Sequence, residues 1–365
     1  MKLSRLFCPE SGQARRVRMQ ENIRKAYQFL MDNGQSIVSN EAAIALGQES
    51  EERRQKMLQH PQVQYWIDCA DQFRLKRQIH NSADTCLENW MHKLLSFGVR
   101  ERDDSRLETL NREILQFIRD NPDDGFFFNT VNCTIAASWL ICMGHQDKLV
   151  TDVIAERVHV VHEFIRKKNY DIYVDPVGYP TIPKQRAMHP LVNPVLYEKN
   201  VWKLPTVHDI FAFANLPEAL RNSSIQSKID DIIEYILDER YQRLYRGYGL
   251  MLVPPRAYYS MGWSVHLDHY FDNTPGLSQD GVVWAMELMS HFKPARESAW
   301  FRKTLQHLQE FEKDGLYEFP AAYLTESKNK YFVFGGHMGL GENRKNKTAL
   351  MIESTAWMLR ILKER

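Results

Sequence analysis

Apolar residues recur along this chain at the three- and four-residue spacing of amphipathic helices. Within 17–31, one such stripe is formed by Ile23, Tyr27, Leu30 and Met31, and Asn33-Gly34 supplies the stop signal. Similar stripes predict helices over 106–120, 150–166, 206–219, 224–243, 258–271, 280–292, 295–312 and 347–363. Residues 130–143 are apolar nearly all round, which predicts an inner helix covered on every side.

A pattern also repeats along the chain: a helical apolar stretch, a charged turn, a glycine and then aromatic residues. Its clearest copies end in Asp123-Asp124-Gly125-Phe126 and Asp314-Gly315-Leu316-Tyr317, and a weaker copy ends in Gly247-Tyr248-Gly249. Self-similarity of this kind is typical of helical hairpins arranged in a stack or a ring. We therefore expect an all-α fold in which the Asp-Gly pairs form turns of the scaffold.

Three stretches interrupt the helical pattern, around residues 169–205, 247–257 and 325–346. The first holds six prolines, the second holds Pro254-Pro255, and the third holds a short extended patch over 330–334. Long irregular segments in a compact chain are often functional, as a lid or a rim, and the alternative is a rigid packing loop. We expect function at these interruptions, within a single domain that spans 1–365.

The bulk composition limits the partners. Hydrophobic residues make up 44% of the 365-residue chain, and 47 basic against 46 acidic residues leave a net charge of +1. A full core is therefore expected and a nucleic-acid partner is not, because nucleic-acid binders usually carry a basic surplus. The 5 scattered cysteines, the N-terminus without a signal peptide and the lack of an 18-residue apolar run predict a cytoplasmic protein with no membrane span.

An outer helix, an Asp-Gly turn and an apolar inner helix follow one another in two parts of the chain. The segments are 123–126 with 134–140, and 314–317 with 353–362. This arrangement resembles the α/α-toroid proteins, which include terpene cyclases of the squalene-hopene type and the β subunits of protein prenyltransferases. The resemblance implies a ring of helical hairpins. The D-x-D-D motif of the cyclases does not occur, and no cysteine for a prenyltransferase zinc site follows Cys142.

The densest polar and aromatic segment is 254–270. On a helix, His266 and His269 share a face at i, i+3, a spacing that can offer two imidazoles to one metal ion, whereas Asp268 points away from both. Histidines hydrogen-bonded in a polar interior are favoured, so we predict no metal site. The functional hypothesis is acid/base chemistry by one of these three residues. The same segment supplies candidates for substrate binding: Arg256, Tyr258, Tyr259 and Trp263.

A second candidate site is the glycine-rich stretch 335–344, before the last predicted helix. Glycines there let backbone N–H groups approach an anion, and Arg344 can add positive charge; the favoured alternative is a tight loop into that helix. Among these glycines, His337 is a candidate for an exposed catalytic group. Glu353 in the final helix either faces the cavity as a catalytic carboxylate or pairs with a nearby arginine, and the salt bridge is favoured.

Together these features predict a helical toroid whose central aromatic cavity is lined by the candidates named above. We expect an enzyme that uses acid/base chemistry on a small or medium organic, isoprenoid-like substrate. Two alternatives stay open: a non-catalytic ligand-binding or scaffolding toroid, and an (α/α)-barrel enzyme that acts on polysaccharides. The aromatic content of 12% suits such a cavity, and thick helix packing explains it as well. The sequence identifies no cofactor and sets no oligomeric state.

Overall fold

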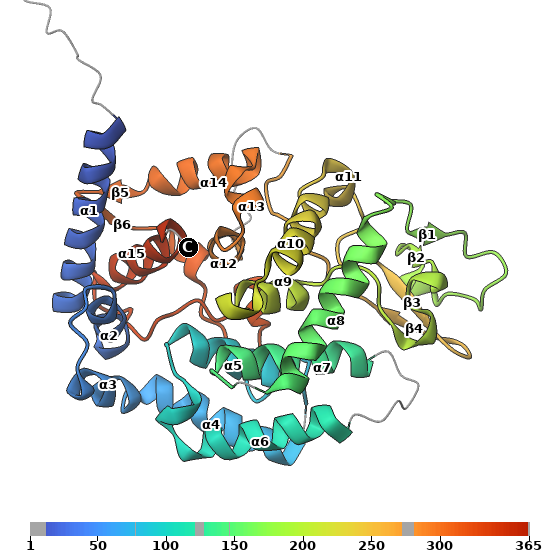
Figure 1. Ribbon diagram of the computed structural model, residues 1–365, viewed down its shortest axis with the longest axis horizontal. Coiled ribbons are helices and arrows are strands. Elements are labelled where there is room, and N and C mark those ends of the chain that lie inside the picture. Colours follow the sequence, from blue (N-terminus) through green and yellow to red (C-terminus); the bar gives the residue numbers. More distant parts are fainter. Residues whose placement is uncertain (1–11, 77, 121–127, 146, 272–280, 364–365) are drawn as a thin grey trace, which may run out of the picture.

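The computed structural model describes residues 12–76, 78–120, 128–145, 147–271 and 281–363. Its helices are α1 (Gly12–Asn33), α2 (Ser36–Ala45), α3 (Glu51–Leu58), α4 (Pro61–Lys76), α5 (Leu87–Ser96), α6 (Ser105–Asp120), α7 (Phe128–Cys142), α8 (Lys148–Ile165), α9 (Val207–Ala214), α10 (Ser223–Ile236), α11 (Glu239–Gln242), α12 (Val282–Ser290), α13 (Lys293–Glu297), α14 (Ala299–Gln309) and α15 (Ala349–Leu362). The strands are β1 (Tyr173–Val174), β2 (Leu191–Val192), β3 (Leu250–Val253), β4 (Ala257–Ser260), β5 (Glu312–Lys313) and β6 (Leu316–Tyr317). The described chain is therefore mostly helical, as predicted, with few and short strands (Figure 1).

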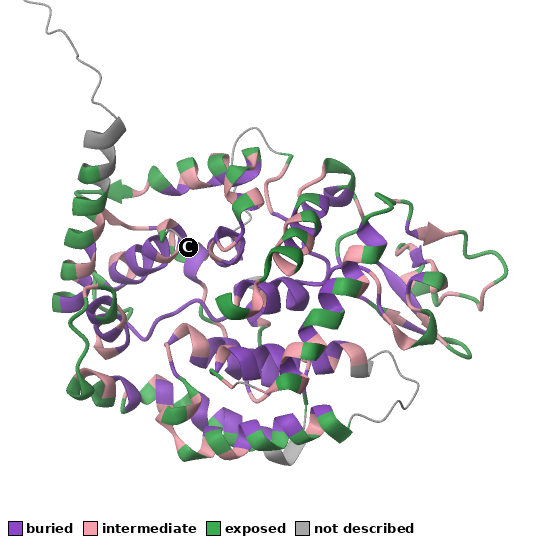
Figure 2. Ribbon diagram, viewed as in Figure 1, coloured by how far each residue is buried: buried purple, intermediate pink, exposed green. Residues whose placement is uncertain are grey.

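Two kinds of helix alternate along the chain. Helices such as α6 and α10 are amphipathic: in α6 the buried residues Leu107, Leu110, Ile114 and Ile118 lie three or four positions apart. Other helices, such as α7 directly after α6 and α12 further along the chain, are buried along most of their length (Figure 2). The prediction of an inner helix over 130–143 is confirmed by α7, whose apolar residues leave no face for water.

The buried helices contact one another in series. Contacts run from α5 to α7, from α7 to α9, from α9 to α12 and from α12 to α15, while the amphipathic helices α4, α6, α8 and α14 pack against members of this series (Figure 1). Arg360 of α15 donates to Ser96 O at the end of α5 (2.8 Å) and pairs with Glu41 of α2 (2.5 Å). These bonds join the last helix of the series to the first.

The predicted helix over 258–271 is wrong. Residues 257–260 form β4, which pairs antiparallel with β3 across the turn at 254–256, and an irregular segment follows. The backbone N–H groups of this segment find partners on another part of the chain, because Val265 N–H donates to Tyr241 Oη and Leu267 N–H donates to Gln242 Oε1, both at 2.9 Å. Side chains of α11 therefore take the place of helical carbonyls.

The other irregular stretches also contain ordered structure. The excursion 169–205 supplies β1 and β2 to a sheet of order β1-β2-β3-β4, in which β2 and β3 run parallel. The extended patch predicted over 330–334 is wrong, because 332–334 is a 3₁₀ turn. The Asp314-Gly315 turn is confirmed: both residues have positive φ (56° and 83°) and join β5 to β6. The copy at 123–126 lies outside the described residues.

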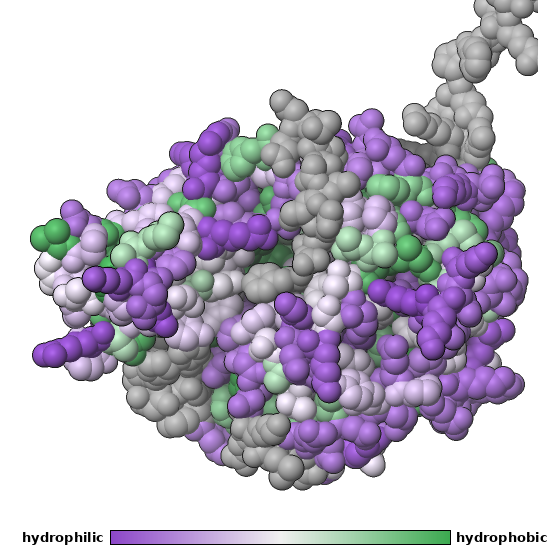
Figure 3. All heavy atoms as spheres, turned by 180° about the vertical axis from the view of Figure 1, so that it is seen from behind, coloured by the Kyte–Doolittle hydropathy of each residue, from purple (hydrophilic) through white to green (hydrophobic). Residues whose placement is uncertain are grey.

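The surface and the interior differ in polarity. Hydrophilic residues cover most of the face in Figure 3, and hydrophobic residues appear in smaller patches between them. No helix of the described chain is both long enough and apolar enough to cross a membrane. The apolar side chains of the inner helices thus form a core beneath a polar surface.

A buried ion pair joins α8 to α9. Nε and Nη2 of Arg157 each lie 2.8 Å from a carboxylate oxygen of Asp209, and Nη1 donates to Trp202 O at 2.6 Å. Asp209 also accepts from the backbone N–H and the hydroxyl of Thr206, the N-cap of α9. Because the side chains of the pair are only 6% and 1% exposed, each charge depends on the other for stability.

We expect Asp209→Asn to lower the free energy of unfolding by about 3–5 kcal/mol, since it leaves the Arg157 guanidinium buried without a counter-charge. Urea unfolding followed by circular dichroism measures this. The control is Asp231→Asn, which removes a half-exposed carboxylate bonded to His162 and should cost less than about 1 kcal/mol. Equal losses in the two variants would contradict the role assigned to the buried pair.

Candidate functional site

A cavity of about 1210 Å³ lies between the inner helices and the N-terminal helices α1, α2 and α3. The C-terminal ends of these helices reach its lining at Ser96, Cys142, Asn215, His291 and Leu362. Its buried end is aromatic and includes Phe211, Trp284, Phe332 and Trp357, together with His92. The volume exceeds that of most sites for small ligands, and an aromatic end is typical of such sites, whereas the rest of the lining carries many polar and charged side chains.

His92 of α5 is the polar group at the buried end of this cavity. Its ring packs on Phe211 and Phe332, with centroids 4.1 and 4.8 Å away. Neither ring nitrogen has a hydrogen-bond partner in the described part of the chain. Burial lowers the pKa of His92 to about 3, so the imidazole is neutral at pH 7 and offers one donor and one acceptor.

One helical turn before His92, the carboxyl group of Glu88 meets two further histidines. His80 Nδ1 lies 2.8 Å from Glu88 Oε2, and His208 Nε2 of α9 lies 3.4 Å from the same oxygen. Burial raises the pKa of Glu88, although His80 acts in the opposite direction, and burial lowers the pKa of His208 well below its usual range. Desolvation therefore favours the neutral form of both groups.

Aromatic side chains surround His80. Trp263 Nε1–H donates to His80 Nε2 at 3.0 Å, and the ring of Tyr331 stacks on the imidazole at 5.4 Å. The ring of Tyr259 lies 6.1 Å from that of Trp263. Two of the substrate-binding residues predicted from the sequence, Tyr259 and Trp263, are thus brought together beside a group of titratable residues.

The titratable residues of this group were missed in the sequence. Glu88 and His92 are four positions apart and share one face of α5, a spacing that could have indicated them. His80 comes from the loop before α5, and His208 comes from the first turn of α9. No local motif links these elements, so their proximity is visible only in three dimensions.

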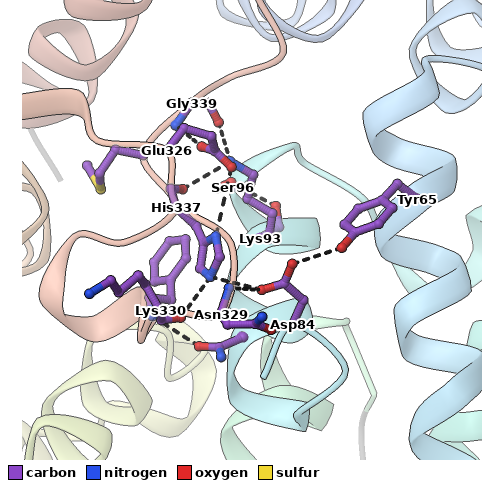
Figure 4. Close-up of polar contacts among 12 residues, drawn as sticks. Tyr65, Asp84, Lys93, Ser96, Glu326, Asn329, Lys330, His337 and Gly339 are labelled. Carbon is purple, nitrogen blue, oxygen red and sulfur yellow. Dashed lines mark hydrogen bonds and ion pairs between the residues drawn. The ribbon is translucent and has the colours of Figure 1, made fainter. Parts of the chain in front are cut away.

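Lys93, which follows His92, is fully buried and uses all three of its donors. Its Nζ donates to Glu326 Oε2 (2.8 Å), His337 O (3.0 Å) and Gly339 O (2.5 Å), as Figure 4 shows. Burial alone would raise the pKa of Glu326, but the ammonium group of Lys93 and the hydrogen bonds to the carboxylate hold it at about 2. The ion pair therefore anchors the glycine-rich stretch on α5.

His337 lies inside the protein, with 1% of its side chain exposed, so the prediction of an exposed histidine is wrong. Its Nε2–H donates to Lys330 O at 2.8 Å and lies 3.7 Å from Asp84 Oδ1. Asp84 in turn accepts hydrogen bonds from Tyr65 Oη–H and Asn329 N–H, both at 2.8 Å (Figure 4). The glycine-rich stretch packs over Lys93, and His337 therefore lies in the interior.

The salt bridge predicted for Glu353 is confirmed. Arg344 Nη2 lies 2.7 Å from Glu353 Oε2, and Glu353 Oε1 accepts from Leu340 N–H at 2.7 Å, so this carboxylate fastens the end of the glycine-rich stretch.

Nearby, Glu342 Oε1 accepts from Gln35 N–H at 2.6 Å. Burial, reinforced by the charge of Glu353, raises the pKa of Glu342 to about 7.

The residues of 254–270 have separate surroundings. Both ring nitrogens of His266 are engaged, with Ser264 Oγ at 2.6 Å and Leu244 O at 2.9 Å, and Asp268 pairs with Arg246 at 2.8 Å. His266 and His269 share no helical face because no helix forms there.

The two remaining substrate-binding candidates of that segment belong to the β3–β4 hairpin. Arg256 is exposed in the turn, and the hydroxyl of Tyr258 donates to Pro180 O. In the described structure, none of the candidates predicted from the sequence lines the central cavity. Their catalytic and binding roles stay predictions, but their expected convergence on this cavity is wrong.

Glu342 predicts a pH dependence of stability. Its pKa in the folded protein, about 7, is above the ordinary value of 4.5, so the folded state binds more protons than the unfolded state between these pH values. The free energy of unfolding therefore falls as the pH rises through this window. Glu342→Gln keeps the hydrogen bond and removes the charge, so we expect it to gain about 1–3 kcal/mol over the wild type between pH 5 and pH 8.

Urea unfolding at several pH values tests this expectation. The control Glu297→Gln removes an exposed carboxylate and should follow the wild-type profile. If the free energy of unfolding changed with pH in the same way in Glu342→Gln and in the wild type, the carboxyl group of Glu342 would not have a raised pKa in the folded protein.

The described structure thus contains two groups of polar side chains at the inner helices. The anchors are ion-paired, as the buried Lys93 is with Glu326 and the buried Glu353 is with Arg344. His92 at the cavity and Glu88 beside its histidines each have a buried polar atom that forms no hydrogen bond in the described part of the chain. Comparisons of the chain with models of protein families, with curated proteins and with solved structures give no match.

Proposed function

We propose that the chain is a cytoplasmic enzyme with an α/α-toroid fold, which acts by acid/base chemistry on a small or medium organic, isoprenoid-like substrate in its central cavity. The alternation of amphipathic and buried helices supports the toroid, as do the serial contacts from α5 to α15 and the bonds of Arg360 that join their ends. The free cysteines of the described chain, Cys69, Cys86, Cys133 and Cys142, fit a reducing compartment.

The observation that carries this proposal is the imidazole of His92. A buried polar group without a partner costs about 1–3 kcal/mol, and a residue chosen only for packing would avoid that cost. The ring faces an aromatic cavity that can hold the apolar body of a substrate. Being neutral, it can donate a hydrogen bond to the substrate or accept a proton from it, and these are the two halves of acid/base chemistry.

The open end of the cavity has a different chemistry. Five basic side chains and two acidic ones belong to its lining; the basic ones are Arg54, Arg100, Arg102, Arg360 and Lys363. Arg100, Arg102 and Lys363 form no ion pair with another described residue. A surplus of positive charge at this end suits an anionic head group, so an isoprenoid diphosphate complements both ends of the cavity.

We expect His92→Leu to separate function from stability. Leucine has a similar volume and needs no hydrogen bond, so the free energy of unfolding should stay the same or rise by up to about 3 kcal/mol. Binding of farnesyl diphosphate, measured by calorimetry, should weaken at least tenfold. Product formation, measured by mass spectrometry with farnesyl diphosphate, squalene and oligosaccharides as substrates, should fall by a factor of about 10²–10⁴.

The matched control is His162→Leu, which removes a histidine that is bonded to Asp231 and does not belong to the cavity lining. It should change neither binding nor turnover. Binding without turnover by the wild type would favour the non-catalytic toroid. Loss of stability by more than about 2 kcal/mol in His92→Leu, with binding retained, would contradict the assigned role and mark His92 as a packing residue.

A further inference from the structure

We propose that His80, Glu88 and His208 form a binding site for one divalent transition-metal ion, with zinc as the ion that its donors fit best. The ligand atoms of the three side chains all lie within 4.8 Å of one another. They come from the loop before α5, the first turn of α5 and the first turn of α9, so the packed helices hold them in place. This inference does not depend on the proposed function.

The first argument concerns charge. Glu88 is fully buried, and the described ionisable side chains that lie against its carboxyl group are those of His80 and His208. The nearby ammonium group of Lys93 does not serve it, because that group is bonded to Glu326 and to two carbonyl oxygens. A divalent cation would supply the counter-charge that the described protein does not give to this carboxylate.

The second argument concerns unpartnered atoms. Within the described chain, Glu88 Oε1 and His208 Nε2 are both buried and have no hydrogen bond. Two such atoms in one cluster require an explanation, and a single bound ion would engage both. His208 can ligate, since its Nε2 lies 3.4 Å from Glu88 Oε2 and a neutral imidazole carries a free lone pair.

The donor set selects the kind of ion. Two imidazoles and one carboxylate are the protein ligands of many zinc sites that keep a fourth position open for water. Nitrogen donors disfavour magnesium and calcium, which prefer oxygen alone. The site therefore fits zinc or a neighbouring first-row ion.

The hydrogen bond from Trp263 determines which ring nitrogen of His80 carries the proton, and metal binding must move that proton to the other nitrogen. Because Trp263 Nε1–H donates to His80 Nε2, the proton of the neutral His80 ring lies on Nδ1, which faces Glu88 at 2.8 Å. An ion bound at Nδ1 requires that proton to move to Nε2, with no net change in the charge of the ring. The indole N–H must then turn away, so Trp263 opposes metal binding and its fluorescence should report it.

Calorimetric titration of the chelator-treated full chain with zinc chloride tests the proposal. We expect one ion per chain in the wild type, and at least about 100-fold weaker binding in Glu88→Gln and in His208→Ala. Trp263→Phe removes the competing N–H, so zinc should bind up to about tenfold more tightly and part of the fluorescence change should vanish. The control His162→Ala removes a histidine outside the cluster and should bind zinc as the wild type does.

Several outcomes would overturn the proposal. They are no zinc binding by the wild type at micromolar concentration, unchanged binding in both ligand variants, and weaker binding in Trp263→Phe. Glu88→Gln removes a buried carboxyl group and keeps the volume of the side chain, so it should fold with a melting temperature at or above that of the wild type. It therefore keeps the test valid where His208→Ala, which leaves a cavity, has a lower melting temperature. X-ray absorption of the zinc-loaded wild type gives an independent test: two imidazoles and no sulfur are expected, and a sulfur ligand from the nearby Cys86 would contradict the assignment.

Discussion

The desolvation of helix α5 is the constraint on which the rest of this structure depends. Every side chain from 87 to 94 is buried, and Glu88, Asn89, His92 and Lys93 are among them. A polar group that leaves water must find a partner inside the protein or remain a cost to folding. Asn89 and Lys93 find partners on neighbouring loops, whereas Glu88 is only partly satisfied and His92 has no partner in the described chain.

The satisfied and unsatisfied groups have different consequences. The hydrogen bonds of buried Lys93 hold the stretch around Glu326 and Gly339 against the inner helices. His337 belongs to this stretch and is therefore buried as well. Of the groups that have no hydrogen bond in the described chain, His92 belongs to the lining of the cavity and Glu88 to the histidine cluster. Burial also favours the neutral form of His92, so this ring offers one uncharged donor and one uncharged acceptor at the cavity.

The sequence predicted the parts of the fold that follow from burial on one face. Amphipathic stripes identified helices such as α6 and α8, and the uniformly apolar 130–143 identified α7, because these patterns are local. No local pattern identifies the structure of 258–271, because backbone N–H groups of this segment bond to the side chains of Tyr241 and Gln242, which are distant in sequence. Helix α5 was not predicted, although Leu87, Trp90, Met91 and Leu94 recur at helical spacing. That spacing does not show that the polar residues between them are buried as well. The cluster it helps to build unites residues that no spacing in the sequence connects.

The central claim is that α5 holds at the cavity an uncharged imidazole that has no hydrogen-bond partner among the described residues. The most direct measurement is a two-bond ¹H–¹⁵N correlation spectrum of histidine-labelled protein, recorded from pH 7 to pH 4 and assigned with the His92→Leu variant. The account predicts that the ring nitrogens of His92 keep the shifts of a neutral imidazole over this whole range. Conversion to the imidazolium form near the ordinary pKa of about 6.5 would contradict it.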